Sequence, residues 1–191
     1  ISLLQISYKI YAAVILHRLR DAGAEDRIWT TQFGFRSSYG TNDALFIIRR
    51  LIDRALASKD ESLIILALDW AKAFDSISPD ALCVALFRFG INANMTTIIR
   101  NIYTVNMKWE GHLSIYYPQK FGISQGCPLS PFLFSILITK IMYDCRRYFD
   151  SFPNILRELL YADDTLLIGQ DASMIQRYMQ IVAREGRKYG L

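Results

Sequence analysis

Apolar residues recur at helical spacing in two stretches near the start of the chain. Residues 8–20 place Ile10 and Val14 on one helical track, so a helix is predicted there. A second helix is predicted over residues 41–57, where Thr41 or Asn42 can cap its start. The apolar face of this second helix is expected to consist of Leu45, Ile48, Ile52 and Leu56.

Further helices are predicted from periodicity and from residues that begin and end helices. The best marked one has Ser78 as its N-cap, Pro79 at its first position and Gly90 at its end. Others are expected over residues 95–103, 131–149 and 172–190, and the middle one is apolar enough to be a buried helix. The inward residues of the last helix are expected to be Met174, Tyr178, Ile181 and Val182.

Between these helices the apolar pattern changes to that of strands. Residues 62–70 form a short continuous apolar run, which is typical of a strand buried on both faces. Residues 107–124 alternate and contain turn residues, which favours a hairpin. Residues 158–169 predict a strand, a turn and a second strand. Helices mixed with a few short strands, with no repeat or linker, predict an α+β fold.

Composition narrows the class of protein only moderately. The chain has 191 residues, 52% of them apolar and 13% aromatic, which is enough for one domain or two packed subdomains and excludes general disorder. The net charge of +4 permits a polyanionic partner without requiring one. Three widely spaced cysteines favour a reducing compartment and argue against a zinc site. No apolar run approaches the ~20 residues of a membrane span, so no membrane partner is expected.

Three aspartates lie where apolar strands are predicted to end. Asp163 and Asp164 are adjacent within the strand–turn–strand, and Asp69 closes the apolar run of residues 62–70. Adjacent carboxylates repel and are costly to bury, so the pair either lies on an exposed turn or is compensated by a cation. If the two strands are neighbours in one sheet, the three carboxylates converge on a site for Mg²⁺ or Mn²⁺. Taken singly, each feature is better explained by a solvated turn or a helix N-cap.

Motifs along the chain resemble those of reverse transcriptases. LDWAKAFDSI (residues 68–77), GISQGCPLSP (residues 122–131) and YADD (residues 161–164) are similar to three successive palm motifs of that family in order and spacing. ISLLQISYKIYAAVILHRL and QFGFRSSYGTNDALF resemble finger motifs of its non-LTR retrotransposon group. The resemblance covers essentially the whole chain.

The resemblance implies a right-hand polymerase fold. Its palm would be a small antiparallel sheet backed by helices, over about residues 61–77 and 131–191. The fingers would take up about residues 1–60 and 78–130, and no thumb is expected within these residues.

The same resemblance implies metal-dependent nucleotidyl transfer. Asp69 and Asp163 would be the principal ligands of two Mg²⁺ ions, which Mn²⁺ could replace, with Asp164 as the accessory acid and the carbonyl of Trp70 as a further ligand. Two ions ~3.5–4 Å apart activate a hydroxyl and stabilise the leaving oxygen in such reactions. The implied reaction adds dNTPs to the 3′-OH of a DNA primer on an RNA template.

Other motif positions are implied to bind the nucleotide. The amides of Lys72 and Ala73 would face the triphosphate, and the ring of Phe74 would exclude a ribose 2′-OH by steric clash. Outside this motif Phe74 would be taken for an ordinary core aromatic. Gln125 and Gly126 would contact nucleotide and template, the glycine by allowing close backbone approach.

A finger segment is implied to cover the template or the nucleotide. It comprises Arg36 with its neighbours Gln32, Gly34 and Phe35. Asp75 has no catalytic part in the family pattern and is expected to be structural. The scattered arginines are solvated by default, and some are expected to contact phosphates of a template–primer duplex.

The family pattern extends beyond both ends of this sequence. The family's upstream arginine would precede Ile1, and its next motif would begin about where the chain ends at Leu191. A longer parent chain is therefore expected, with a thumb and possibly an endonuclease domain outside these residues. An intracellular and, for this family, nuclear location is an expectation from the resemblance, since no localisation signal is visible.

Three alternatives remain at the level of sequence. A group II intron-type or retron-type reverse transcriptase would differ in its flanking domains. A catalytically silent palm that serves as an RNA-binding scaffold need not retain Asp69, Asp163, Asp164, Gln125 and Phe74. An unrelated metal-dependent phosphohydrolase leaves the QGCPLSP stretch unexplained.

Overall fold

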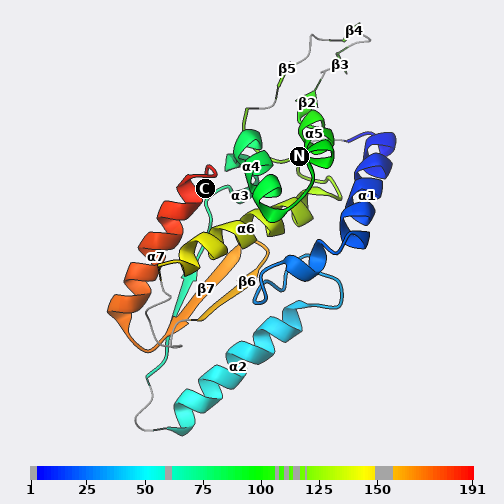
Figure 1. Cartoon of the computed structure of the whole chain (residues 1–191). Coiled ribbons are helices and arrows are strands. Elements are labelled where there is room, and N and C mark those ends of the chain that lie inside the picture. Colours follow the sequence, from blue (N-terminus) through cyan, green and yellow to red (C-terminus); the bar gives the residue numbers. More distant parts are fainter. Residues whose placement is uncertain are drawn as a thin grey trace.

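A computed structural model describes residues 4–58, 62–105, 108–109, 112–113, 117–118, 120–148 and 157–191. Its helices are α1 (Ile6–Asp21), the 3-10 turn η1 (Glu25–Arg27), α2 (Thr41–Ala57), α3 (Ala73–Ser76), α4 (Pro79–Phe89), α5 (Ala93–Asn101), α6 (Ser130–Arg146) and α7 (Ala172–Arg187). Its strands are β1 (Ile64–Leu68), β2 (Thr104–Val105), β3 (Lys108–Trp109), β4 (His112–Leu113), β5 (Tyr117–Pro118), β6 (Arg157–Tyr161) and β7 (Asp164–Gly169). Figure 1 shows their arrangement.

The central sheet is small and antiparallel, with the strand order β1-β7-β6. β6 and β7 form the predicted strand–turn–strand, and β1 pairs with β7 from Ile64 opposite Gly169 to Leu68 opposite Thr165. On the other side of β6, Gln32 forms a parallel bridge with Leu160. The condition for convergence of the aspartates, that the strand before Asp69 neighbours the strand that begins at Asp164, is therefore met.

The sheet is a layer between two groups of helices (Figure 1). Side chains alternate between the faces of a strand, so each strand serves two cores. Leu160 and Leu167 belong to the large core with α6 and α7, whereas Leu159 and Ile168 belong to a smaller core with Ala44 of α2. This arrangement confirms the expected palm sheet backed by helices.

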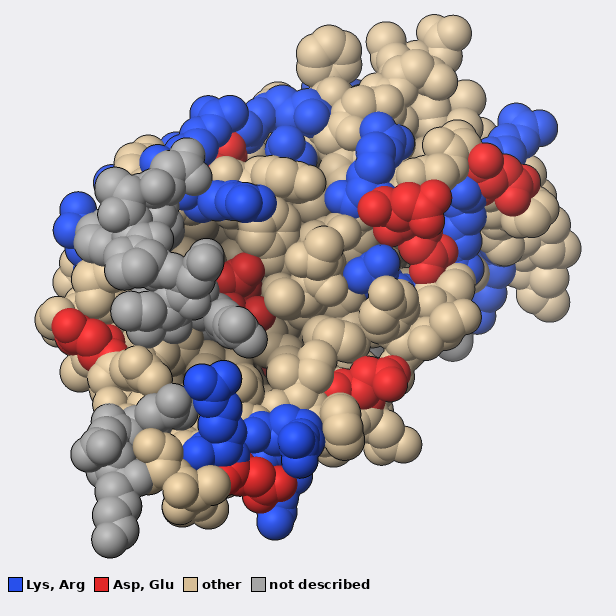
Figure 2. All heavy atoms as spheres, turned by 60° about the horizontal axis from the view of Figure 1, so that its bottom comes forward, with Lys and Arg blue, Asp and Glu red and all other residues tan. Residues whose placement is uncertain are grey.

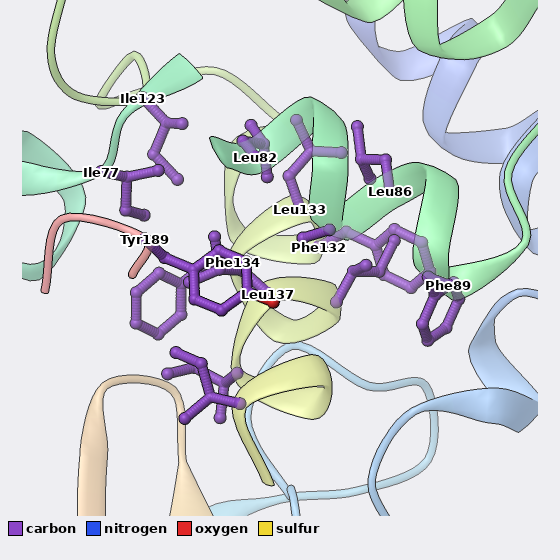
Figure 3. Close-up of a cluster of buried hydrophobic side chains, with 14 of the residues drawn as sticks. Ile77, Leu82, Leu86, Phe89, Ile123, Phe132, Leu133, Phe134, Leu137 and Tyr189 are labelled. Atoms are coloured by element: carbon purple, nitrogen blue, oxygen red, sulfur yellow. The ribbon is translucent and has the colours of Figure 1, made fainter. Parts of the chain in front are cut away.

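α6 is the centre of the large core. Phe132, Leu133, Phe134 and Leu137 of this helix are essentially inaccessible to solvent, and α4 supplies Leu82 to the same cluster (Figure 3). Each such side chain contributes about 1.5–3 kcal/mol through burial. The prediction of a buried helix starting near Pro131 is confirmed.

Local sequence signals set the ends of the helices around this core. The Ser78 side chain accepts a hydrogen bond from the amide of Ala81, and Gly90 ends α4 with a φ of 95°. Asn92 caps α5 and Asp171 caps α7 through bonds of the same type. The predicted limits of α4 are confirmed, because its start and stop residues act locally.

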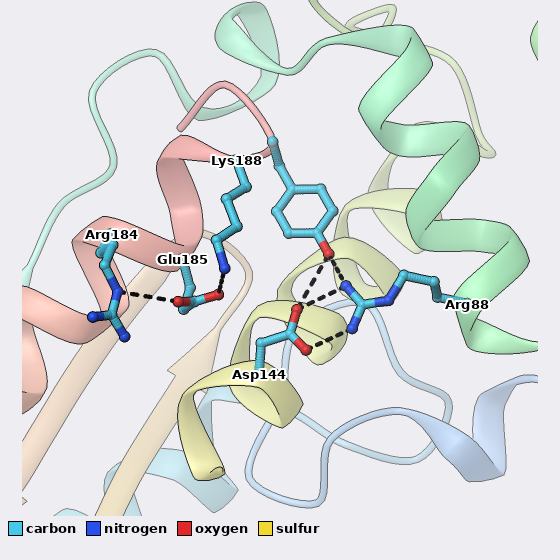
Figure 4. A network of polar contacts seen from close by, with 6 residues as sticks. Arg88, Asp144, Arg184, Glu185 and Lys188 are labelled. Carbon is cyan, nitrogen blue, oxygen red and sulfur yellow. Dashed lines mark hydrogen bonds and ion pairs between the residues drawn. The ribbon is translucent and has the colours of Figure 1, made fainter. Parts of the chain in front are cut away.

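Arg88, Asp144 and Tyr189 form a polar network that joins α4, α6 and the end of the chain (Figure 4). The two Nη atoms of Arg88 donate to the two carboxylate oxygens of Asp144 at 2.7 and 2.5 Å. These hydrogen bonds hold the pKa of the Asp144 carboxyl below its usual value and raise the pKa of the Arg88 guanidinium. A second group lies on α7, where Arg184 and Lys188 both contact the buried carboxylate of Glu185.

The inward faces of α1 and α2 differ from the sequence prediction. In α1 the buried residues are Ala12, Ile15 and Leu19, while Ile10 and Val14 are exposed. In α2 only Ala44 is buried, and the expected face residues Leu45 and Leu56 are exposed. Both helices carry apolar residues around much of their circumference, so spacing alone does not identify the packed side.

The strand before Asp69 also differs, because β1 is only half buried rather than buried on both faces. It is an edge strand, and its Ala67 is exposed. Within residues 107–124, β3 pairs with β4, and β5 pairs with β2, which lies just before this stretch; both pairs are antiparallel, as a hairpin requires. The rest of that stretch, and the turn at Pro153-Asn154, lie outside the described residues.

The predicted inward face of α7 agrees with the structure. Tyr178, Ile181 and Val182 are buried, and Met174 is half buried. Among the described helices, none has both the length and the apolar character needed to cross a membrane.

We predict that Asp144→Asn lowers the free energy of unfolding at pH 7 by about 2–4 kcal/mol, because it leaves the Arg88 guanidinium without its charged partner. A lowered pKa means that this stabilisation is complete above the ordinary aspartate pKa of about 3.9 and is lost as pH falls towards the lower folded-state pKa. Urea unfolding of both proteins at several pH values measures the difference. The gap between them should therefore narrow below pH 4.

Asp80→Asn is the matched control, since it removes the same charge from an exposed pair with Arg100. It should change stability by less than about 1 kcal/mol at any pH. If Asp144→Asn behaved like this control, the buried network would have no stabilising role.

Candidate active site

Asp69 directly follows β1, and the strand register brings it next to Asp164. β1 and β7 pair Leu68 with Thr165, so the next pair in the same register is Asp69 opposite Asp164. Opposite residues of antiparallel strands point to the same face, with Cβ atoms about 4.5–5.5 Å apart. The face is that of the pair Ala67 and Leu166, which α6 and α7 do not cover. Ala67 and both aspartates are exposed there, so this end of the sheet is open.

Asp163 lies in the tight turn between β6 and β7. Tyr161 pairs with Asp164, so the loop consists of only Ala162 and Asp163. Ala162 has a φ of 58°, a left-handed conformation that glycine adopts freely and alanine adopts at a cost. The turn therefore places Asp163 beside Asp164 at the same end of the sheet as Asp69.

The loop before α2, which contains Gln32 and Gly34, contacts the backbone of this turn. The side-chain amide of Gln32 accepts a bond from the Ala162 N–H at 3.0 Å and donates to the Ala162 carbonyl at 3.1 Å. Gly34 lies against the same backbone, where an added Cβ would be 2.1 Å from the Ala162 nitrogen. Both residues are buried. The expectation that their segment covers the template or the nucleotide stays a prediction.

Trp70 anchors the chain on the opposite face from Asp69. Its indole Nε1 donates to Thr165 Oγ1 at 3.1 Å, and its ring packs on α7 where Gly186 leaves room. A Cβ at Gly186 would lie 2.6 Å from the ring. With Trp70 fixed on the inner face, the preceding Asp69 is directed to the open one.

The side chains at this end of the sheet are of the type that binds a hard divalent cation, and they lie near one another. Asp69, Asp163 and Asp164 offer only oxygen ligands, which Mg²⁺ and Mn²⁺ prefer. In the described part of the chain, no three Asp, Glu, His or Cys side chains are drawn together into a ready-made metal cluster. Carboxylates repel one another when no cation compensates their charge. The argument for a cation site therefore depends on the backbone, that is, on the strand register and the turn that place these aspartates at one end of the sheet.

The Trp70 carbonyl and the residues after it form a short turn into α3. The N–H of Ala73 donates to the Trp70 carbonyl at 3.2 Å, which leaves that oxygen a second lone pair for a cation. The same bond engages the Ala73 amide within the turn, and its contact with a triphosphate stays a prediction. Lys72 is exposed and takes a left-handed φ of 54° at the start of α3.

Phe74 lies between two other aromatic rings. It stacks on the fully buried Phe134 of α6 with centroids 4.8 Å apart, and the exposed Phe35 meets its edge at 6.5 Å. Phe74 itself is half buried. Its position is therefore fixed from the core, while part of the ring remains at the surface.

The QGCPLSP segment packs against the same α3 turn. The Ile123 N–H donates to the Phe74 carbonyl at 2.7 Å, and Gln125 Nε2 donates to Asp75 Oδ1 at 3.1 Å. Asp75 thus has the structural role that was expected, since it orients Gln125. Gly126 is exposed with a φ of 82° and open space beside it, which suits a close approach of another molecule.

The side chain of Arg36 contacts other residues of its own loop. Its Nη1 donates to the carbonyl of Gln32 at 3.2 Å, and its guanidinium lies 4.2 Å from the ring centroid of Tyr39. The buried Nε of Arg36 has no hydrogen-bond partner. A contact with template or nucleotide remains a prediction for this residue.

The structural roles of several residues that shape the site were not predicted from the sequence. Gln32 and Gly34 contact the turn at Ala162, which is distant in the sequence. Thr165 accepts a hydrogen bond from Trp70, and Gly186 leaves room for its ring. The positive φ of Ala162 could not be foreseen, because YADD contains no glycine. The one available signal was that Gln32 and Gly34 lie within a recognisable motif. The sequence does not indicate which other segment that motif contacts in the fold.

Known proteins resemble this chain in sequence along nearly its whole length. A family model described as reverse transcriptase (RNA-dependent DNA polymerase) matches residues 1–191. A transposon TX1 uncharacterized 149 kDa protein of Xenopus laevis is 30% identical over 195 residues, covering 93% of this chain and 14% of the relative. A Pol polyprotein from the type-1 retrotransposable element R2 of Popillia japonica is 26% identical over 171 residues, covering 82% of this chain and 24% of the relative. The chain thus spans a quarter or less of these relatives.

Solved structures share the fold at low sequence identity. Apo telomerase from Candida tropicalis, truncated from its C-terminal domain, superposes with a TM-score of 0.63 and 16% identity over 96% of this chain and 38% of that one. Telomerase from Candida albicans, in complex with a TWJ fragment of telomeric RNA, gives 0.64 and 18% over 94% of this chain and 32% of that one. The small sheet with α6 and α7 behind it is therefore a polymerase palm, joined to fingers. The family match over the full length and the order of the motifs agree, and the chain belongs to the reverse transcriptase family.

Proposed function

We propose that this chain is the fingers–palm part of an RNA-directed DNA polymerase of the non-LTR retrotransposon type. The observation that carries the proposal is the register of β1 and β7, whose continuation sets Asp69 opposite Asp164, beside the turn that holds Asp163, at the open end of the sheet. The retrotransposon relatives support the type of element. Such an enzyme transfers dNTPs to a primer 3′-OH, and nuclear action is part of the same proposal.

Asp69 and Asp163 would hold two Mg²⁺ ions, or Mn²⁺, with Asp164 as a further acid and the free lone pair of the Trp70 carbonyl as a neutral ligand. When bound, the ions supply Lewis acidity towards the primer hydroxyl and the leaving pyrophosphate. The chain itself contributes rigidity, because Trp70 and Thr165 fix the backbone on each side of the acidic residues. Gln125 is presented by Asp75 at the adjoining surface, where it would contact the nucleotide together with Gly126.

Phe74 would select deoxynucleotides. A ring that must exclude one hydroxyl has to be immobile, and the stack on Phe134 supplies that immobility. Removing the ring would leave space that a ribose 2′-OH could fill. Discrimination of this kind depends on a clash with the wrong substrate rather than on a gain with the right one.

The template–primer duplex would be bound mainly through its backbone. Figure 2 shows Lys and Arg side chains in several groups over one face, with Asp and Glu among them. Some arginines of the chain are paired on the protein, as Arg49 is with Asp53 and Arg20 with Glu25. A net charge of +4 with such mixed charges suits a modest, sequence-independent attraction to phosphates.

Replacing Asp69 or Asp163 with Asn should reduce primer extension at least about a hundredfold, because either change removes a charged ligand from the cation site. The assay is Mg²⁺-dependent extension of a DNA primer on an RNA template, carried out with the longest available polypeptide that contains this chain. Asp80→Asn removes the same charge from the exposed surface of α4 and should leave the rate unchanged. Wild-type rates in the Asp69 or Asp163 variants would refute the assignment, and extension by none of the proteins would favour the silent scaffold.

Phe74→Val should lower the preference for dNTPs over rNTPs about ten- to a hundredfold, with a smaller effect on dNTP use alone. Single-nucleotide incorporation with each substrate gives the ratio of kcat/KM. Phe46→Val is the control, since Phe46 is an exposed phenylalanine of α2. An unchanged ratio in Phe74→Val would mean that Phe74 is only a core residue.

A further inference from the structure

Gln32 is a polar residue with no exposed surface, and all its polar groups are engaged. Its backbone N–H donates to the Trp29 carbonyl, and its own carbonyl accepts from Arg36. Its side-chain oxygen accepts from the amides of Gly34 at 2.8 Å and Ala162 at 3.0 Å, and its side-chain nitrogen donates to the Ala162 carbonyl. A buried amide with this many partners specifies one geometry.

The partner of that amide is the strained residue of the acidic turn. Ala162 is held at a φ of 58°, a left-handed conformation that is unfavourable for alanine because its Cβ crowds the following carbonyl oxygen. Two hydrogen bonds between the Gln32 side chain and both polar groups of Ala162 offset that cost. Glycine, the residue that would adopt this φ without strain, is not present in YADD.

The loop around Gln32 is fixed to the sheet independently of its side chain. The Phe33 N–H donates to the Leu160 carbonyl at 2.8 Å, and the Leu160 N–H donates to the Thr31 carbonyl at 2.9 Å. Gly34 closes the contact, since any Cβ there would overlap the Ala162 backbone. The loop thus extends the palm sheet beyond β6, and it holds Gln32 at a set distance from the turn.

We propose that Gln32 is a positioning residue for the metal-binding aspartates. Its amide holds Ala162 in the left-handed conformation, and this conformation orients Asp163 and Asp164 towards Asp69. The inference rests on the proposed function, because it concerns the same carboxylates. It adds a segment of the fingers to the residues on which metal binding depends.

The chemistry of an amide is essential to this role. Only a side chain that accepts and donates at adjacent atoms can pair with both the N–H and the carbonyl of one residue. Methionine has a similar length and volume but neither group, so Gln32→Met would leave the amides of Gly34 and Ala162 and the carbonyl of Ala162 buried without partners. The turn would then be free to relax from its strained conformation.

The test measures Mn²⁺ binding, with the metal alone as probe, by calorimetric or spin-resonance titration of the 191-residue chain. Gln32→Met should weaken Mn²⁺ binding about tenfold or more, approaching the loss in Asp163→Asn. Tyr178→Phe is the matched control, because it removes a different buried hydrogen bond, to Glu158 Oε2 on β6. It should lower thermal stability while leaving Mn²⁺ affinity within about twofold of wild type.

A second variant separates positioning from general destabilisation. In Gln32→Met/Ala162→Gly the glycine accepts the left-handed φ without the amide, so Mn²⁺ affinity should recover to within about threefold of wild type. This double variant also decides the matter if Gln32→Met alone does not fold. Recovery supports the positioning role, whereas a folded double variant with affinity as weak as that of Asp163→Asn overturns it.

The controls distinguish failure of this inference from failure of the proposed function. Wild-type affinity in folded Gln32→Met, together with loss in Asp163→Asn, overturns the role of Gln32 and leaves the metal site standing. Mn²⁺ binding that Asp163→Asn does not weaken overturns both.

Discussion

The antiparallel pairing of β1 with β7 is the constraint on which the site depends. Because side chains alternate along strands, a shift of one residue in this register would turn Asp69 into the core with α6 and α7. The register is held by apolar pairs such as Leu66 with Leu167, and by the bond from Trp70 to Thr165 at the end of the ladder. Packing on the inner face therefore decides which carboxylates meet on the outer face.

The residues that stabilise the fold and the three aspartates of the candidate site lie in different regions of the structure. The large core around α6 and the buried network of Arg88 with Asp144 lie behind the sheet, where burial and paired charges stabilise it. The three aspartates lie at the open end of the sheet, and their mutual repulsion is tolerated because two of them are exposed and one is half exposed. The strain at Ala162 lies at the boundary between these two regions, where the buried amide of Gln32 supports the turn between β6 and β7.

Much of this architecture could be predicted from the sequence, and the failures have physical causes. The limits of α4 were predictable because Ser78 and Gly90 act on neighbouring backbone groups, and the β6–β7 hairpin was predictable because its strands flank one short turn. The inward faces of α1 and α2 were not, since several sides of each helix carry apolar residues and only tertiary packing selects one. The partnership of Gln32 with Ala162 was equally hidden, because it depends on two segments 130 residues apart in the chain.

The measurement that tests the account most directly is a crystal structure of the chain soaked in Mn²⁺, with the ion located by its anomalous scattering. The account predicts Mn²⁺ bound between Asp69 and Asp163, with Asp164 adjacent and Ala162 still at positive φ. Mn²⁺ bound only elsewhere, or Asp69 and Asp164 on opposite faces of the sheet, would contradict it.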